Sequence, residues 1–220
     1  MAFFALFTFL TIIRFYFKVK ANVFRERIFS RDESVGLIAA RAVIGIPLVV
    51  AILNYLFFPQ RLPWMRLPLP VWLRWSGLLL AGLSLTFLIW VHRALGKNFS
   101  TSIRVKRDHA LVKTGPYSLL RHPMYSAYFL IFLSAFFISG NWIIGASGLA
   151  VILLLMTVRL RLEEGLLVGR FGPDYVHYCD LTPRFVPRPG FRKHLPEDAS
   201  TYAERIGETN GNLSPPSCKP

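Results

Sequence analysis

Long apolar runs separated by basic segments dominate the hydropathy pattern of this 220-residue chain. A membrane-spanning helix needs about 20 consecutive apolar residues, because the hydrocarbon core of a bilayer is about 30 Å thick. Two runs reach that length, and two more fall a few residues short of it. The pattern therefore predicts a multi-pass membrane protein, with spans at residues 35–58, 71–92, 124–139 and 142–158.

Residues 1–13 form a shorter apolar and aromatic run. Because about a dozen residues are too few to cross a bilayer, we expect this run to form a short interfacial or re-entrant helix. Only helices and closed barrels satisfy the backbone inside lipid, and the runs are too long for strands. The predicted fold class is thus all-α, a multi-pass membrane protein with about four to five membrane helices.

The last two predicted spans are joined by Gly140 and Asn141 alone. A connection of two residues forces the flanking helices to run antiparallel, as a C-terminal helical hairpin. The chain therefore returns, after residue 158, to the membrane surface at which residue 123 enters. Side chains near these two points are distant in sequence, but we expect them at the same depth, around a common pocket.

Basic residues are unevenly divided among the segments that connect the spans. Residues 14–34, residues 93–121 and the chain after residue 158 are rich in lysine and arginine, whereas residues 59–70 contain two arginines and residues 140–141 none. Because cytoplasmic loops carry the excess of positive charge, we expect both termini and the pocket to face the cytoplasm. This topology and anionic lipid headgroups explain the net charge of +14, so no nucleic-acid partner is expected.

Composition divides the chain into three parts. Residues 1–92 hold the N-terminal membrane helices, and residues 93–187 hold the hairpin together with the candidate chemistry. Residues 188–220 are polar and rich in proline, glycine, asparagine and serine. A segment with so few apolar residues cannot bury a core, and we expect this tail to be disordered.

Ionisable and aromatic side chains gather where the first arm of the hairpin enters the membrane. Pro123 suits the first position of a helix, where its missing N–H group costs nothing, and this places His122 at or near the N-cap. Arg121, Tyr117 and Tyr125 are its neighbours in sequence. Polar groups at such a position in a membrane protein are a functional-site hypothesis by default.

The end of the second arm carries Arg159, Glu163 and Glu164. The arginine and the first glutamate are four residues apart, so they share one helix face. Acidic residues near the C-terminal end of a helix oppose its dipole, which is an argument for a functional role, and a solvated helix end beyond the membrane is the alternative. We expect His122 to lie opposite Glu163 across the hairpin.

Six short motifs lie along the second half of the chain. They are His-Ala-Leu-Val at 109–112, Gly-Pro-Tyr at 115–117, Arg-His-Pro-Met-Tyr at 121–125, Glu-Glu at 163–164, Phe-Gly at 171–172 and Thr-Pro-Arg-Phe at 182–185. Together with Tyr175 and Tyr178, this set resembles the isoprenylcysteine carboxyl methyltransferase family. It is also similar to the related phospholipid N-methyltransferases. The resemblance covers residues 95–187.

The resemblance implies a membrane methyltransferase that uses S-adenosylmethionine. It also implies that the first four of these motifs hold the cofactor, which assigns to it His109, Ala110, Leu111, Val112, Tyr117, His122, Pro123, Met124, Tyr125, Glu163 and Glu164. Arg159 occupies the place of a substrate-holding arginine in the isoprenylcysteine enzymes. We therefore expect Arg159 and Glu163 to be the catalytic residues and Arg159 to bind the substrate.

Arg159 favours a carboxylate substrate, because guanidinium and carboxylate groups pair strongly. We expect O-methylation of a lipophilic carboxylate, such as a prenylated cysteine, that arrives from the bilayer. N-methylation of a phospholipid or small amine, a nicotinamide-dependent enzyme similar to sterol reductases, and a non-catalytic scaffold are the alternatives. The histidines lack metal-ligand spacing, so no metal is expected.

Overall fold

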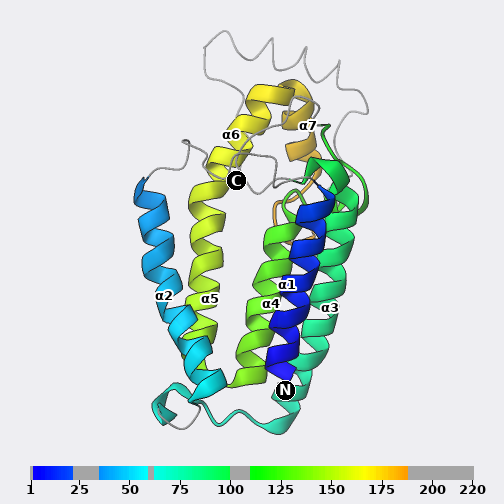
Figure 1. The fold of residues 1–220 in the computed structure, drawn as a ribbon. Helices are drawn as coiled ribbons and strands as arrows, with labels where there is room; N and C mark the ends of the chain where they lie inside the picture. Colours follow the sequence, from blue (N-terminus) through cyan, green and yellow to red (C-terminus); the bar gives the residue numbers. More distant parts are fainter. Residues whose placement is uncertain (1, 22–34, 59–61, 100–109, 188–220) are drawn as a thin grey trace.

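The computed structural model describes residues 2–21, 35–58, 62–99 and 110–187, and the regular elements of these residues are helices. Five helices lie side by side, and two shorter ones, α6 and α7, cover one end of the bundle (Figure 1). The helices are α1 (Ala2–Lys20), α2 (Val35–Phe57), α3 (Val71–Leu95), α4 (Pro123–Ser139), α5 (Trp142–Leu154), α6 (Leu160–Phe171) and α7 (Pro173–Leu181).

The first helix is longer than the sequence pattern predicted. α1 runs for 19 residues to Lys20 and is long and apolar enough to cross a membrane. The helix continues past its first charge because aromatic residues follow it and Phe17 is buried in the bundle. The Arg14 guanidinium lies 5.4 Å from the centre of the Tyr128 ring on α4, and such a cation–π contact accommodates the charge. The expected short interfacial helix is thus corrected to a helix of spanning length.

The second arm of the hairpin is also longer than predicted. A π-helical turn, Leu155–Arg159, links α5 to α6, and residues 142–171 form one continuous helix of 30 residues. At 1.5 Å per residue this helix is about 45 Å long, which exceeds the hydrocarbon core of a bilayer. α6 therefore projects beyond the membrane and carries Glu163 and Glu164 with it.

The two-residue connection of the hairpin is as predicted. Gly140 ends α4 in a left-handed conformation, with φ of 61°, which glycine adopts without strain. The Asn141 side chain then accepts hydrogen bonds from the backbone N–H groups of Ile143 and Ile144, at 3.0 and 3.2 Å. This is an N-cap, which satisfies donors that the helix leaves open. The turn thus fixes α4 and α5 as antiparallel neighbours.

Glycine residues bring the central helices unusually close together. A Cβ atom at Gly145 on α5 would lie 2.7 Å from the Phe136 ring of α4, and Gly148 faces the Phe132 ring in the same way. On α3, a Cβ atom at Gly77 would lie 2.6 Å from the Cβ atom of Phe137. Small residues allow such close packing of membrane helices. α3, α4 and α5 therefore form a closely packed three-helix core.

We expect the change Gly77→Ala to destabilise the protein by about 1–3 kcal/mol, because an added methyl group overpacks the α3–α4 contact. The added atom would also lie 3.1 Å from the backbone nitrogen of Ile138, which cannot rotate away as a side chain can. The measurement is thermal unfolding in detergent. Gly82→Ala on the same helix is the matched control, since nothing lies within 4 Å of its added atom. Equal unfolding temperatures for the two variants would contradict the close packing.

Candidate active site

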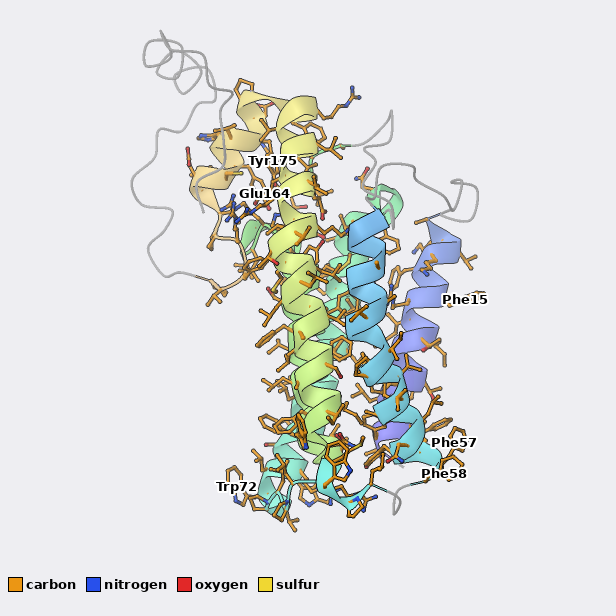
Figure 2. All side chains as sticks on the ribbon, turned by 90° about the vertical axis from the view of Figure 1, so that its left-hand side faces the viewer. Phe15, Phe57, Phe58, Trp72, Glu164 and Tyr175 are labelled. Atoms are coloured by element: carbon orange, nitrogen blue, oxygen red, sulfur yellow. The ribbon has the colours of Figure 1, made fainter. Side chains whose placement is uncertain are left out.

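The candidate site lies where α4 begins, between a short 3-10 helix, Gly115–Ser118, and the first turns of α6. His122 is the N-cap residue of α4 and Pro123 its first helical residue, as the sequence predicted. The chain after α7 returns to the same place. Figure 2 shows Glu164 and Tyr175 together at this end of the bundle, far from Trp72 at the other end.

Glu164 is the centre of a buried charge cluster. Its side chain is 7% exposed, and its carboxylate accepts from three basic side chains. Arg121 Nη1 lies 3.3 Å and His122 Nε2 lies 3.1 Å from Oε1. The Arg184 guanidinium lies across both oxygens, with Nε 3.2 Å from Oε1 and Nη2 2.6 Å from Oε2. Such a bidentate arginine–carboxylate pair fixes both partners in orientation.

This cluster corrects the expected pairing of His122 with Glu163. Successive helix residues point about 100° apart, and on α6 it is Glu164 that faces the start of α4 and is buried. Glu163 is only half-buried and meets a different residue. The Tyr125 hydroxyl group donates a 3.0 Å hydrogen bond to Glu163 Oε2. The two adjacent glutamates thus have different surroundings.

The segment after α7 is held against the start of α4 by hydrogen bonds to its backbone carbonyl groups. The Arg121 N–H group donates to the Pro183 carbonyl at 2.8 Å, and the His122 N–H group donates to the Arg184 carbonyl at 3.1 Å. The Ser126 hydroxyl group donates to the Phe185 carbonyl at 2.8 Å. Sequence reasoning gave no role to Arg184, and the only signal for it was its place in the Thr-Pro-Arg-Phe motif.

Three tyrosines, Tyr117, Tyr175 and Tyr178, lie near the charged residues of the site. Tyr178 donates a 2.6 Å hydrogen bond from its hydroxyl group to the Tyr117 carbonyl, which ties α7 to the 3-10 helix. Burial, and next the negative charge of Glu163, raise the pKa of Tyr117 well above its usual range. Burial likewise raises the pKa of Tyr175. Both phenols therefore stay neutral, and Tyr175 has no hydrogen-bond partner for its buried hydroxyl group among the described residues.

The remaining residues assigned to a cofactor are placed unevenly. Leu111 packs against the cluster of Tyr175 and Tyr178, next to the site. Ala110 is exposed and donates from its N–H group to Asn98 Oδ1 at 3.3 Å. Met124 packs into the hydrophobic core of the bundle. Val112 is half-buried in the segment that follows Leu111, and the expected role of His109 lies outside the described residues.

Arg159 lies at the junction of the π-helical turn and α6, and its backbone has helical angles. It is half-buried and lies one helical turn before Glu163, so the two share a helix face as predicted. A π-helical turn of this kind often occurs at functional sites. The extra residue in the turn sets the direction in which the whole of α6 faces the start of α4.

Residues 77–169 match the model of the "Isoprenylcysteine carboxyl methyltransferase (ICMT) family". This confirms the resemblance that the motifs indicated. The matched range begins inside α3, earlier than the motifs did, and ends before the Phe-Gly and Thr-Pro-Arg-Phe motifs. It includes the Tyr125–Glu163 pair, Arg121, His122 and Glu164, and not Arg184.

Curated relatives are similar over part of this chain. Protein-S-isoprenylcysteine O-methyltransferase of Schizosaccharomyces pombe is 33% identical over 94 residues, which are 42% of this chain and 40% of that enzyme. The cobalt-zinc-cadmium resistance protein CzcN of Cupriavidus metallidurans is 29% identical over 149 residues, 64% of each chain. The chain thus matches less than half the length of the yeast enzyme. Its described residues contain no group of three or more potential metal ligands.

A solved structure, that of a eukaryotic intramembrane Ras methyltransferase named isoprenylcysteine carboxyl methyltransferase, is similar in fold. The TM-score is 0.56 with 18% sequence identity, over 89% of this chain and 70% of that chain. At this identity the likeness concerns the fold alone. It confirms the predicted all-α, multi-pass membrane architecture, while the division into parts at residues 92 and 187 stays a prediction and the tail, 188–220, lies outside the described residues.

We expect Glu164→Gln to destabilise the protein by about 3–5 kcal/mol, because it leaves buried arginines without their counter-charge. Glu163→Gln is the matched control on the same helix, since Glu163 is half-buried and stands outside the cluster. Unfolding of both variants in detergent, followed by circular dichroism, checks the difference. A Glu164→Gln protein as stable as Glu163→Gln would contradict the structural role of the cluster.

Proposed function

We propose that this protein is a membrane-embedded methyltransferase that uses S-adenosylmethionine and methylates a lipophilic carboxylate, such as a prenylated cysteine. The observation that carries the proposal is the Tyr125–Glu163 pair. It lies at the membrane-entry end of α4, inside the region that matches a family of methyltransferases. Glu164 is fully engaged by Arg121, His122 and Arg184, whereas Oε1 of Glu163 accepts no hydrogen bond from the residues that the structure describes.

The donor set of the site fits S-adenosylmethionine. This cofactor carries an ammonium group, a carboxylate and a sulfonium, so a pocket for it needs both signs of charge. Glu163 offers a half-buried carboxylate for the ammonium group, and Tyr125 fixes the orientation of that carboxylate. The positive end of the α4 dipole, at the helix N-terminus that begins at Pro123, favours the carboxylate of the cofactor. The uncharged phenol of Tyr117 and the side chain of Leu111 offer nonionic surface beside them.

The His122 side chain takes a supporting role in this proposal. Its Nε2 atom is already engaged by Glu164, so His122 positions the start of α4 rather than holding a charged end of the cofactor. When bound, S-adenosylmethionine supplies a methyl group on a sulfonium centre for transfer. The protein needs only to orient the two reactants, and positioning of this kind supplies a large part of the acceleration in two-substrate reactions.

Arg159 is the proposed substrate residue. It lies one turn before Glu163, on the membrane side of α6, where a substrate anchored in the bilayer arrives with its carboxylate foremost. A guanidinium group binds a carboxylate in a fixed geometry. It thereby aims a carboxylate oxygen at the methyl group without any need to remove a proton.

The proposed orientation places the site on the cytoplasmic side. α1 and α3 end at the same end of the bundle as the site (Figure 1), and basic residues occupy their last turns. These are Lys18, Lys20 and Arg93. Arg121 and Arg170 add to the positive charge at this end, which supports a cytoplasmic position by the positive-inside rule.

We expect Glu163→Gln to weaken binding of S-adenosylmethionine by about 10-fold to 100-fold, since a hydrogen bond to a charged group contributes about 1.5–3 kcal/mol. Isothermal titration calorimetry on the purified protein in detergent measures this loss. Asp174→Asn is the matched control, because it removes the same charge from an exposed position on α7. Binding that is absent from the unmodified protein would contradict the proposal as a whole.

We expect Arg159→Lys to raise the KM for an S-farnesylcysteine analogue about 10-fold, because lysine keeps the charge but loses the planar fork. The affinity for S-adenosylmethionine should stay unchanged. With a methyl-tritiated cofactor, product label that base treatment releases indicates a methyl ester. Label that resists base indicates N-methylation, and this result would overturn the carboxylate substrate while leaving the cofactor assignment intact.

A further inference from the structure

A polar cavity lies at the end of the bundle opposite the candidate site. It has a volume of about 480 Å³ and lies between the start of α1, the end of α2 and the connector to α3. Phe4, Tyr55, Arg66, Arg74 and Gly140 are among its lining residues. In Figure 2 this end is marked by Phe57, Phe58 and Trp72. Nothing in the proposed methyl transfer uses it.

The connector that forms one wall of the cavity is fixed by backbone contacts. The Leu67 N–H group donates to the Gly140 carbonyl at 2.7 Å, and an isolated bridge joins Arg66 to Asn141. A Cβ atom at Gly140 would lie 3.1 Å from the Leu67 carbonyl oxygen, and Gly140 has a φ of 61°, so this close approach favours glycine. The wall that carries Arg66 is therefore anchored to the hairpin turn.

Two arginines give the cavity a positive charge that no carboxylate of the described residues balances. Arg74 donates from Nε and Nη2 to the Ile138 carbonyl, at 3.3 and 3.1 Å, which uses two of its five N–H groups. The sequence offers few counter-ions here, because Asp108 is the only acidic residue between Glu33 and Glu163. Since the described residues do not balance this charge, an anion from outside the protein can do so.

The tryptophans place this cavity at the depth of lipid headgroups. Trp64, Trp72, Trp75 and Trp142 are all exposed at this end of the bundle. The Trp142 indole donates a hydrogen bond to the Trp64 carbonyl at 3.2 Å. This bond fixes the positions of two of the four tryptophans. Exposed tryptophans concentrate at the membrane–water interface. A phosphate at that depth lies level with the guanidinium groups.

We infer that this cavity binds the phosphate of a phospholipid in the leaflet opposite the candidate site. Guanidinium groups bind phosphate in a bidentate manner, and the cavity is large enough for a glycerophosphate headgroup. Phe4 and Leu67, both exposed apolar residues at the cavity, provide contacts for the acyl chains. A bound lipid in this position would join α1, α2 and the α2–α3 connector.

The test is native mass spectrometry of the full-length protein released from detergent, with dioleoylphosphatidylglycerol as the probe. We expect one retained lipid per protein, and about a 10-fold weaker retention in Arg66→Gln. The Arg66 side chain forms no hydrogen bond or ion pair with the described residues, and the substitution keeps the backbone bridge to Asn141. Arg93→Gln is the matched control, because it removes the same charge from the exposed far end of α3. Retention should be unchanged in that variant.

Two further probes separate the contribution of the phosphate from that of the acyl chains. Dioleoylglycerol has the same acyl chains without a phosphate and should be retained at least 10-fold less. Glycerol 3-phosphate has the phosphate without the chains and should not displace the lipid at equal concentration. Equal retention of dioleoylglycerol, displacement by glycerol 3-phosphate, or an Arg66→Gln protein that retains lipid as the unmodified protein does would each overturn the inference.

Discussion

The buried carboxylate of Glu164 is the interaction on which the candidate site depends. It binds two guanidinium groups and an imidazole that come from the loop before α4 and from the chain after α7. Burying this many charges is costly unless each is paired, so the cluster forms only when all three segments are in place. It thereby ties the continuous helix of the second hairpin arm to the N-terminus of the first.

This constraint explains why two adjacent glutamates differ in role. Glu164 is held by strong contacts to protein groups and is buried, whereas Glu163 receives one hydrogen bond, from Tyr125, and is half-buried. A positively charged ligand group would compete with the Tyr125 hydroxyl group at Glu163. At Glu164 it would compete with two arginines and a histidine. The Glu164 cluster thus supports the site, and the neighbouring Glu163 is available to bind a ligand.

The sequence was sufficient for the parts of the structure that local patterns determine. Apolar runs predicted α2, α3 and the hairpin, and Pro123 predicted the start of α4. The pattern failed where a tertiary contact changes a local rule. α1 continues through Arg14 because the Tyr128 ring receives that charge, and no periodicity in residues 1–20 contains this information. The choice between Glu163 and Glu164 likewise depends on the angle at which α6 leaves the π-helical turn, and the role of Arg184 depends on where the chain returns after α7.

The two ends of the bundle show how the placement of acidic residues decides what arginine does. At the site end, Arg121 and Arg184 both pair with Glu164 inside the protein, so they act as structural groups. At the other end, Arg66 and Arg74 line a cavity without a carboxylate among the described residues. Membrane interfaces supply phosphate at that depth, whereas the interior of a bundle supplies no anion. The scarcity of acidic residues between Glu33 and Glu163 therefore concentrates internal ion pairing at one interface and leaves the arginines of the other for lipid.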